Sequence, residues 1–288
     1  MRHAYLIMAH NDLFCLNHLL EALDNSDNEI FLHLDKKWNI KIQKIYSVRN
    51  AALHIYQKLD VRWGSFSQIQ CEMFLFEQAA NVGFDYYHLL SGADLPLKSQ
   101  SYIKKFFQYN AGKEFLFFQW YDASKEDKNI IDRVNIYHFF PFKQRRKNYL
   151  LNLFLSRVQK KIFKRRKNLV IYKGANWCSV THKFVKCLLS GKKWIYTVFS
   201  HGFCVDELYK QTIYMKYANQ FKLYKKIPND SHTIMRYIDW NRGAPYVWKS
   251  CDFPELIDSD FLFARKFDSN IDADVIKKIT QFTEMAKE

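Results

Sequence analysis

Short apolar runs alternate with stretches of helical periodicity over the first 120 residues, and this alternation limits the fold more than any other feature. Strands that alternate with helices form a mainly parallel sheet with helices on both faces. The sequence therefore predicts an α/β fold. The predicted strands are 3–10, 29–35, 54–58, 85–92 and 114–121, and the predicted helices are 13–24, 65–82, 99–110 and 272–286.

Ligands bind such a sheet at the carboxyl ends of its strands. The loops after His10, Asp35, Trp63 and Gly92 are therefore the first candidates for a site. The length of the chain allows one domain or two. Because the sequence contains no internal repeat and no linker, we expect one continuous domain over residues 1–288.

A basic segment, residues 143–167, interrupts this pattern. It holds eleven Lys and Arg residues and no acidic residue around an apolar stripe. A basic amphipathic helix of this kind lies on anionic membranes, where each Lys or Arg contributes about 1 kcal/mol. The same pattern fits a helix that packs its stripe on the core and leaves a basic face in water. The sequence leaves both interpretations open.

The chain carries 44 Lys and Arg residues against 29 Asp and Glu residues, a formal net charge of +15. Such a charge attracts nucleic acid, anionic lipid or phosphorylated small molecules. Nucleic acid is not expected as a partner, because the sequence contains none of the usual recognition motifs. Glycine-rich phosphate-binding motifs and zinc-binding motifs are missing too. Since no apolar stretch reaches the roughly 18 residues that cross a bilayer, and the six cysteines lack CxxC spacing, we expect a cytoplasmic protein with reduced thiols.

Seven segments with residues suited to catalysis or binding follow one another along the chain. They are HLDKK (33–37), WGSFSQIQCEMFLFEQA (63–79), YYHLLSGADLPLKS (86–99), YKGANWCSV (172–180), FCVDEL (203–208), RYIDWNRGAPYVWK (236–249) and LFARKFD (262–268). Together they resemble the core-2/I-branching β-1,6-N-acetylglucosaminyltransferase family, whose relatives include peptide xylosyltransferases. The resemblance runs from about residue 3 to residue 270 and is interrupted only by the basic segment.

The resemblance implies a GT-A glycosyltransferase fold, a UDP-sugar donor and inversion at the anomeric carbon. Residues 1–122 would bind the nucleotide sugar, and residues 168–288 would bind the acceptor and the diphosphate. Metal-dependent GT-A enzymes hold Mn²⁺ or Mg²⁺ with an Asp-x-Asp motif. The corresponding segment here, SGADLPL, offers one carboxylate, Asp94, so we expect no metal and no other cofactor. Two Asp-x-Asp triplets occur late in the chain, where helix caps and solvated loops are the favoured interpretation. They are Asp258/Asp260 and Asp272/Asp274.

Family members without the metal bind the diphosphate through two basic side chains. Lys266 in FARKFD matches one of them. The other is usually an Arg, and Lys249 in VWKSCDF is its best match, although it fits a solvated surface charge equally well. Because Lys supplies a point charge where Arg can bind phosphate bidentately, Arg265 or Arg242 could share this role.

An inverting transfer needs a general base that takes the proton from the acceptor hydroxyl. The family places this base in a Pro-Asp-Glu-like segment, and the chain reads Val205-Asp206-Glu207. The resemblance thus implies Glu207 as the catalytic base. Asp206 would bind substrate, orient a neighbour or cap the helix that starts near Leu208. Both acids are also common in the first turn of a helix, where the dipole favours them.

For the donor, the resemblance implies that uridine lies against the first βαβ unit, where Asp35 matches the nucleotide-contacting Asp of the family. Ala9, His10 and Trp63 would form the wall of this site, although His10 fits an interior histidine equally well. An aromatic face can stack on a sugar ring. The candidate acceptor residues are Asp94, Glu114, Arg133 and Trp177.

The function expected from the resemblance is that of a bacterial-type, inverting transferase. It would move a sugar, N-acetylglucosamine first and xylose as the open alternative, from UDP to a glycan or lipid-linked glycan in surface polysaccharide or lipopolysaccharide synthesis. We expect it in the cytoplasm, with peripheral contact at the inner face of the cell membrane. The alternative from another class is a non-catalytic basic protein that binds a membrane surface or nucleic acid through residues 143–167.

Overall fold

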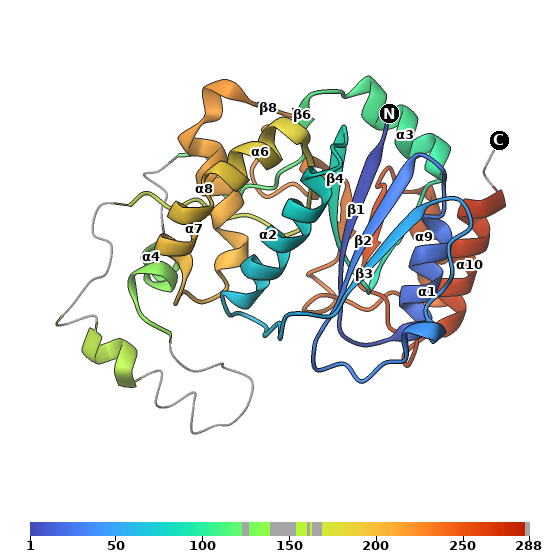
Figure 1. Cartoon of the computed structure of the whole chain (residues 1–288), viewed down its shortest axis with the longest axis horizontal. Helices are drawn as coiled ribbons and strands as arrows, with labels where there is room; N and C mark the ends of the chain where they lie inside the picture. The colour runs from blue at the N-terminus through green and yellow to red at the C-terminus, as the bar shows by residue number, and fades with distance from the viewer. Residues whose placement is uncertain (123–126, 139–153, 160–161, 163–168, 286–288) are drawn as a thin grey trace.

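A five-stranded sheet in the order β3-β2-β1-β4-β7 forms the centre of the protein. Four of its strands run parallel, and β7 runs antiparallel to β4. The strands are β1 (His3–Ala9), β2 (Asn28–Leu34), β3 (Ala52–Tyr56), β4 (Tyr86–Ser91) and β7 (Cys178–Thr181). The computed structural model describes residues 1–122, 127–138, 154–159, 162 and 169–285 (Figure 1).

Both faces of this sheet are buried. Successive side chains of a strand point to opposite faces, so Leu6 of β1 lies in one core and Ile7 lies in the other. Helix α2 (Ser67–Ala80) covers the first face, and helices α1 (Leu13–Ala22) and α10 (Ala273–Met285) cover the second (Figure 1). The predicted α/β fold, with a mainly parallel sheet between helices, is confirmed.

A second, three-stranded sheet brings the C-terminal part of the chain to the main sheet. Strand β5 (Asp94–Pro96) follows β4 almost directly and pairs antiparallel with β10 (Phe263–Arg265). Strand β9 (Arg236–Ile238) pairs parallel with β10 on its other side. Arg265 is opposite Asp94 in this register. The LFARKFD segment therefore lies beside the carboxyl end of β4, far from it in sequence.

The remaining helices surround the two sheets. Helices α6 and α8 lie on the α2 side, and α9 lies beside α10 (Figure 1). Short 3₁₀ turns occur between them. The helices are α3 (Gln100–Tyr109), α4 (Lys128–Asn135), α6 (His182–Ser190), α7 (Lys192–Phe199), α8 (Tyr209–Lys216) and α9 (Phe253–Asp258), and the turns are η1 (Ile42–Lys44), η3 (Val205–Glu207), η4 (Ala218–Gln220), η5 (Ser231–Thr233) and η6 (Ser250–Asp252).

The predicted strand 114–121 differs from the structure. Only its first residue belongs to a strand, the two-residue β6 (Lys113–Glu114), which pairs with β8 (Lys222–Leu223). Phe115 forms only an isolated bridge with Ser179 of β7. Farther along, the backbone bonds to loops, for example from Gln119 N to Lys173 O at 2.8 Å. Four of its apolar side chains, Phe115, Leu116, Phe118 and Trp120, are buried in the core, which explains why its composition resembles that of a strand.

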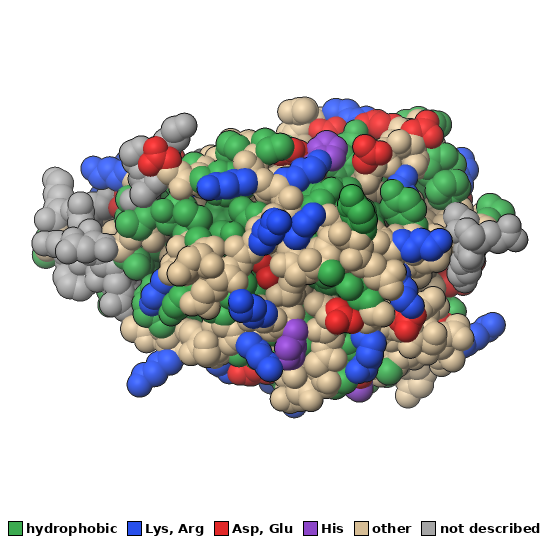
Figure 2. Space-filling model, turned by 90° about the horizontal axis from the view of Figure 1, so that it is seen from above, with side chains coloured by type: hydrophobic (Ala, Val, Ile, Leu, Met, Phe, Trp, Pro, Cys, Tyr) green, Lys and Arg blue, Asp and Glu red, His purple; other side chains and the backbone are tan. Residues whose placement is uncertain are grey.

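Within the part of the chain that the structure describes, no helix is long and apolar enough to span a membrane. Residues 154–159 of the basic segment are helical. The rest of residues 143–167, apart from residue 162, lies outside the described residues. Figure 2 shows Lys and Arg side chains spread over the upper face among apolar and acidic side chains, rather than gathered in one stripe.

A chain of buried polar side chains crosses the main sheet. His3 Nδ1 and His88 Nε2 lie 2.8 Å apart, and His88 Nδ1 lies 2.8 Å from Ser179 Oγ. Arg236 of β9 donates to the same Ser179 oxygen at 3.1 Å. Burial lowers the pKa of His3 to about 4 and holds the pKa of His88 well below its ordinary value. Both imidazoles therefore stay neutral in the folded protein at pH 5.

We expect His88→Gln to reduce the acid sensitivity of the fold. An unfolded histidine binds a proton near pH 6.5 whereas folded His88 does not, so each such group lowers the free energy of unfolding by about 2 kcal/mol as the pH falls from 7.5 to 5. Urea unfolding at both pH values measures this loss, which should be smaller by about that amount in the variant.

A surface substitution that leaves every titratable group in place, Gln108→Asn on α3, supplies the control and should keep the wild-type pH dependence. Burial raises the pKa of Glu114, and of Asp206, to about 7, and these carboxyls change stability in the opposite direction. They are common to all three proteins and cancel in the comparison. An equal loss of stability in the wild type and His88→Gln would show that His88 does not resist protonation.

Candidate active site

The carboxyl ends of β1, β2 and β4 meet at one edge of the main sheet. Asp35 N donates to Ala9 O at 2.7 Å, and Gly92 N donates to Met8 O at 3.0 Å. A Cβ on Gly92 would lie 2.8 Å from the Ala9 Cβ, closer than a side chain permits. Glycine is therefore required where the loop after β4 crosses the end of β1.

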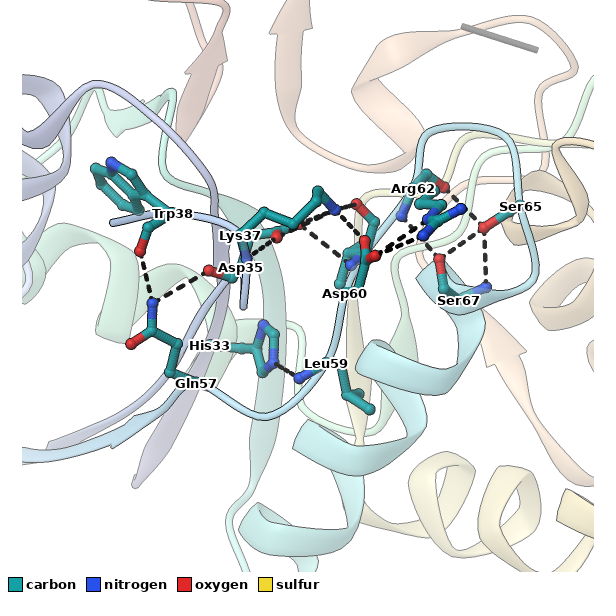
Figure 3. Close-up of polar contacts among 11 residues, drawn as sticks. His33, Asp35, Lys37, Trp38, Gln57, Leu59, Asp60, Arg62, Ser65 and Ser67 are labelled. Carbon is teal, nitrogen blue, oxygen red and sulfur yellow. Dashed lines mark hydrogen bonds and ion pairs between the residues drawn. The ribbon is translucent and has the colours of Figure 1, made fainter. Parts of the chain in front are cut away.

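The Asp35 carboxylate ties the loop after β3 to the end of β2 (Figure 3). Its Oδ1 accepts from Lys37 N at 2.8 Å, and its Oδ2 accepts from Val61 N at 3.1 Å and from Lys37 Nζ at 3.2 Å. Lys37 also pairs with Asp60. Because Asp35 is 4% exposed, its first role is to shape this loop, and a ribose would have to share oxygens that already have donors.

Trp63 and His10 lie on the outside of the same loops. Trp63 is 57% exposed and contacts Phe203 edge to face at 5.7 Å. Gly64, with φ of +71°, accepts through its carbonyl from Cys204 N at 2.8 Å. This bond joins the loop that carries Trp63 to the segment that precedes Glu207. His10 is exposed, so the alternative of an interior histidine is wrong.

Glu207 ends the 3₁₀ turn η3 with a carboxylate that reaches solvent. Its Oε2 accepts from Arg133 Nη1 of α4 at 2.8 Å, and Lys173 Nζ lies 4.0 Å from the same oxygen. Its carbonyl accepts from Gly174 N at 2.9 Å. The side chain is 36% exposed. Two cations and a backbone bond thus orient an accessible carboxylate, and Lys173 is a member of this group that the sequence did not indicate.

Asp206, the neighbouring acid, is buried below Glu207. Its Oδ2 accepts from Gln68 Nε2 at 3.3 Å, and it does not cap helix α8. Desolvation, followed by the charges of Glu72 and Glu207, raises the pKa of Asp206 to about 7. A carboxyl that is 6% exposed does not fit the predicted contact with substrate. It fits the predicted role of a residue that supports its neighbours.

Asp94, Arg265 and Trp177 form one group, although they come from β5, β10 and the loop before β7. Asp94 Oδ1 accepts from Arg265 Nη1 at 2.7 Å and from Ser91 Oγ at 2.9 Å. The Arg265 guanidinium lies 4.3 Å from the centre of the Trp177 ring. Arg265 therefore neutralises Asp94 and covers one face of Trp177, which leaves a sugar only the other face for stacking.

Of the four basic residues considered for a diphosphate, two arginines are committed to carboxylates. Arg242 pairs with Asp239, with Asp252 at 2.9 Å and with Glu255 at 3.1 Å, and Arg265 pairs with Asp94 as described. Lys249 and Lys266 have no acidic partner among the residues that the structure describes. Trp248 N donates to Lys266 O at 3.0 Å, so the two lysine segments lie side by side.

The late Asp-x-Asp triplets include a helix cap, as expected. Asp272 accepts from Val275 N at 3.0 Å at the start of α10 and from Ser250 N at 2.7 Å. In the described ranges, no three His, Cys, Asp or Glu side chains gather in a way that could hold a metal ion.

Glu114 does not lie at this edge, contrary to the prediction that it borders the site. It is 1% exposed and accepts from Thr181 N at 2.8 Å and from Thr181 Oγ1 at 2.6 Å. Thr181 pairs with Tyr86 at the amino end of β4. Glu114 therefore lies at the opposite end of the strand, where burial raises its pKa to about 7. Its position follows from the pairing of Phe115 with Ser179 of β7 and of Thr181 with Tyr86.

The family model described as Core-2/I-Branching enzyme matches residues 3–261. The match spans Ala9, Asp35, Asp94, Glu207 and Lys249 and ends five residues before Lys266. A search among curated proteins finds no match to this chain. Because the family model covers most of the sequence, the chain belongs to the Core-2/I-branching family of glycosyltransferases, whose fold is GT-A-like.

Proposed function

We propose that the protein transfers N-acetylglucosamine from UDP, with inversion, to a hydroxyl of a glycan or lipid-linked glycan in surface polysaccharide or lipopolysaccharide synthesis. The observation that carries this proposal is the Glu207 carboxylate, which is accessible and oriented by Arg133 at the carboxyl edge of a parallel sheet. A catalytic base needs both solvent access and a fixed orientation.

In the proposed reaction the acceptor oxygen attacks the anomeric carbon from the face opposite the UDP. The bond between that carbon and the diphosphate oxygen breaks, and its electron pair leaves with UDP. Glu207 takes the proton of the acceptor hydroxyl as the new bond forms. Arg133 and Lys173 hold the Glu207 carboxylate in place before the reaction, because Arg133 Nη1 lies 2.8 Å and Lys173 Nζ lies 4.0 Å from its Oε2.

The donor is proposed to lie across the loops after β1, β2 and β3, with its diphosphate near Lys249 and Lys266. Both lysines lack acidic partners among the described residues, which supports this placement. Arg242 and Arg265, in contrast, are each paired with an Asp of the protein. As the UDP leaves, the two ammonium groups would balance its growing negative charge. Trp63 is the exposed aromatic wall on the nucleotide side.

We predict that Glu207→Gln lowers kcat by about 10²-fold or more while the affinity for UDP changes little. The amide keeps the shape of the side chain but cannot accept the proton, and a lost general base costs about this much. Transfer or hydrolysis of UDP-N-acetylglucosamine gives kcat, and calorimetry gives the affinity for UDP. Glu77→Gln on α2, which changes a surface carboxylate paired with Lys192, is the control. Wild-type turnover in Glu207→Gln would remove Glu207 from the mechanism.

We also predict that turnover persists in excess EDTA, because lysine charges would take the role of a metal ion. Activity that disappears with EDTA and returns with Mn²⁺ would contradict metal independence.

Lys266→Met should weaken UDP binding, measured by calorimetry, about tenfold or more, the scale of a lost charged contact. Unchanged UDP affinity in Lys266→Met would contradict the diphosphate contact.

We propose peripheral contact between residues 143–167 and the inner face of the cell membrane, on the basis of sequence. Replacing Arg165, Arg166 and Lys167 by Gln should reduce sedimentation with anionic liposomes, because surface attraction depends on these charges and is screened by salt. Hydrolysis of soluble donor should stay unchanged.

A matched control removes three positive charges elsewhere, at Lys222, Lys225 and Lys226. An equal loss of sedimentation in both triple variants would mean that net charge, and not the basic segment, attracts the protein to lipid. A wild type that ignores anionic liposomes at low salt would contradict membrane contact altogether.

A further inference from the structure

An ion pair between two fully buried side chains lies beneath Glu207. Glu72 of α2 and Lys210 of α8 are each 0% exposed, and Lys210 Nζ lies 2.6 Å from Glu72 Oε2. Tyr209 donates its hydroxyl proton to the same oxygen at 2.6 Å. The reaction proposed above uses neither charge.

Stability alone is a poor reason for this pair. Removing two charges from water costs about as much as their attraction returns, and an apolar pair of similar size is often as stable. The group also leaves three buried polar atoms without partners among the described residues, which adds to the cost. These atoms are Glu72 Oε1, Asn176 Nδ2 and Asp206 Oδ1.

The ammonium group of Lys210 contacts both segments that border the Glu207 side of the site. It donates to Asn176 Oδ1 at 2.6 Å and lies 3.4 Å from Asp206 O. Asn176 precedes Trp177, and Asp206 precedes Glu207. A group with three donors and a short distance to each segment fixes their separation.

A second bond joins the same two segments above Lys210. Gly174 N donates to Glu207 O at 2.9 Å. A Cβ on Gly174 would lie 1.8 Å from Phe117 O, so this segment has no freedom to shift toward the core. Lys210 below and Gly174 above therefore connect the Glu207 turn to the loop that carries Lys173 and Trp177.

We propose that Lys210, neutralised by Glu72, is a positioning residue that holds the Glu207 turn against the 172–177 loop. The proposal rests on the proposed function for its consequence in turnover, but the position itself is testable without any substrate. With the Lys210 contacts intact, Glu207 faces the acceptor and Lys173 stays near the Glu207 carboxylate. Without these contacts, the Glu207 turn and the 172–177 loop separate while the sheet remains folded.

The test uses Glu72→Gln/Lys210→Met in the full chain, because the single variant Lys210→Met would leave a buried charge and unfold part of the protein. The double variant removes both charges and keeps the volume of the side chains. The matched control is Glu77→Gln/Lys192→Met, which removes an ion pair between the same helix, α2, and α7 at the surface.

Hydrogen exchange gives the substrate-free readout. We expect the Gly174 amide and peptides over 172–178 and 203–209 to exchange at least tenfold faster in the double variant, while the amides of β1 keep wild-type protection and the control stays unchanged. Equal protection of these peptides in the wild type and the double variant would overturn the proposal.

Kinetics supply the second readout. The double variant should lose at least tenfold in kcat with the KM for donor within about twofold of wild type. Faster exchange at 203–209 with wild-type kcat would overturn the role in the reaction. If the wild type turns over no nucleotide sugar, the proposed function fails, whereas the exchange experiment still decides whether Lys210 holds the two segments.

Discussion

A mainly parallel sheet that is buried on both faces can present polar groups to a ligand only at its ends. The backbone of each strand is satisfied by its neighbours and most of its side chains lie in two apolar cores, so accessible charged groups come from the loops at the strand ends. The first four strands end on Ala9, Leu34, Tyr56 and Ser91, and the loops after them are joined by backbone bonds. The C-terminal strand β10 enters the same region by pairing with β5, which begins three residues after β4 ends.

This constraint explains which parts of the site could be predicted from sequence. Asp35, Asp94 and Glu207 stand directly after or beside recognisable elements, and the order of elements alone puts the first two at the carboxyl edge. The pair of Arg133 with Glu207 could not be foreseen, because 74 residues separate the partners and no periodicity relates them. Glu114 was misplaced because composition shows that its segment is buried but not where a strand ends or with what it pairs.

The positive side chains near the site differ in whether a carboxylate of the protein already neutralises them. Arg133, Arg242 and Arg265 each bind carboxylates of the protein itself, where the planar guanidinium can meet several oxygens at once. Lys249 and Lys266 have no such partner among the described residues. A net charge of +15 therefore says little about the site by itself, since the informative quantity is which cations have already been neutralised.

The buried charges below Glu207 can also be compared by which of them are neutralised. Two carboxyls, Glu72 and Asp206, share the interior with one ammonium, Lys210. Burial raises the pKa of Asp206 to about 7, so this carboxyl can keep its proton near neutral pH and leave the group close to electrical balance. A buried group whose charges cancel can remain rigid without drawing in water or counterions. The accessible carboxylate of Glu207 thus lies above a buried group close to electrical balance, and the charges nearest to its Oε2 are those of Arg133 and Lys173.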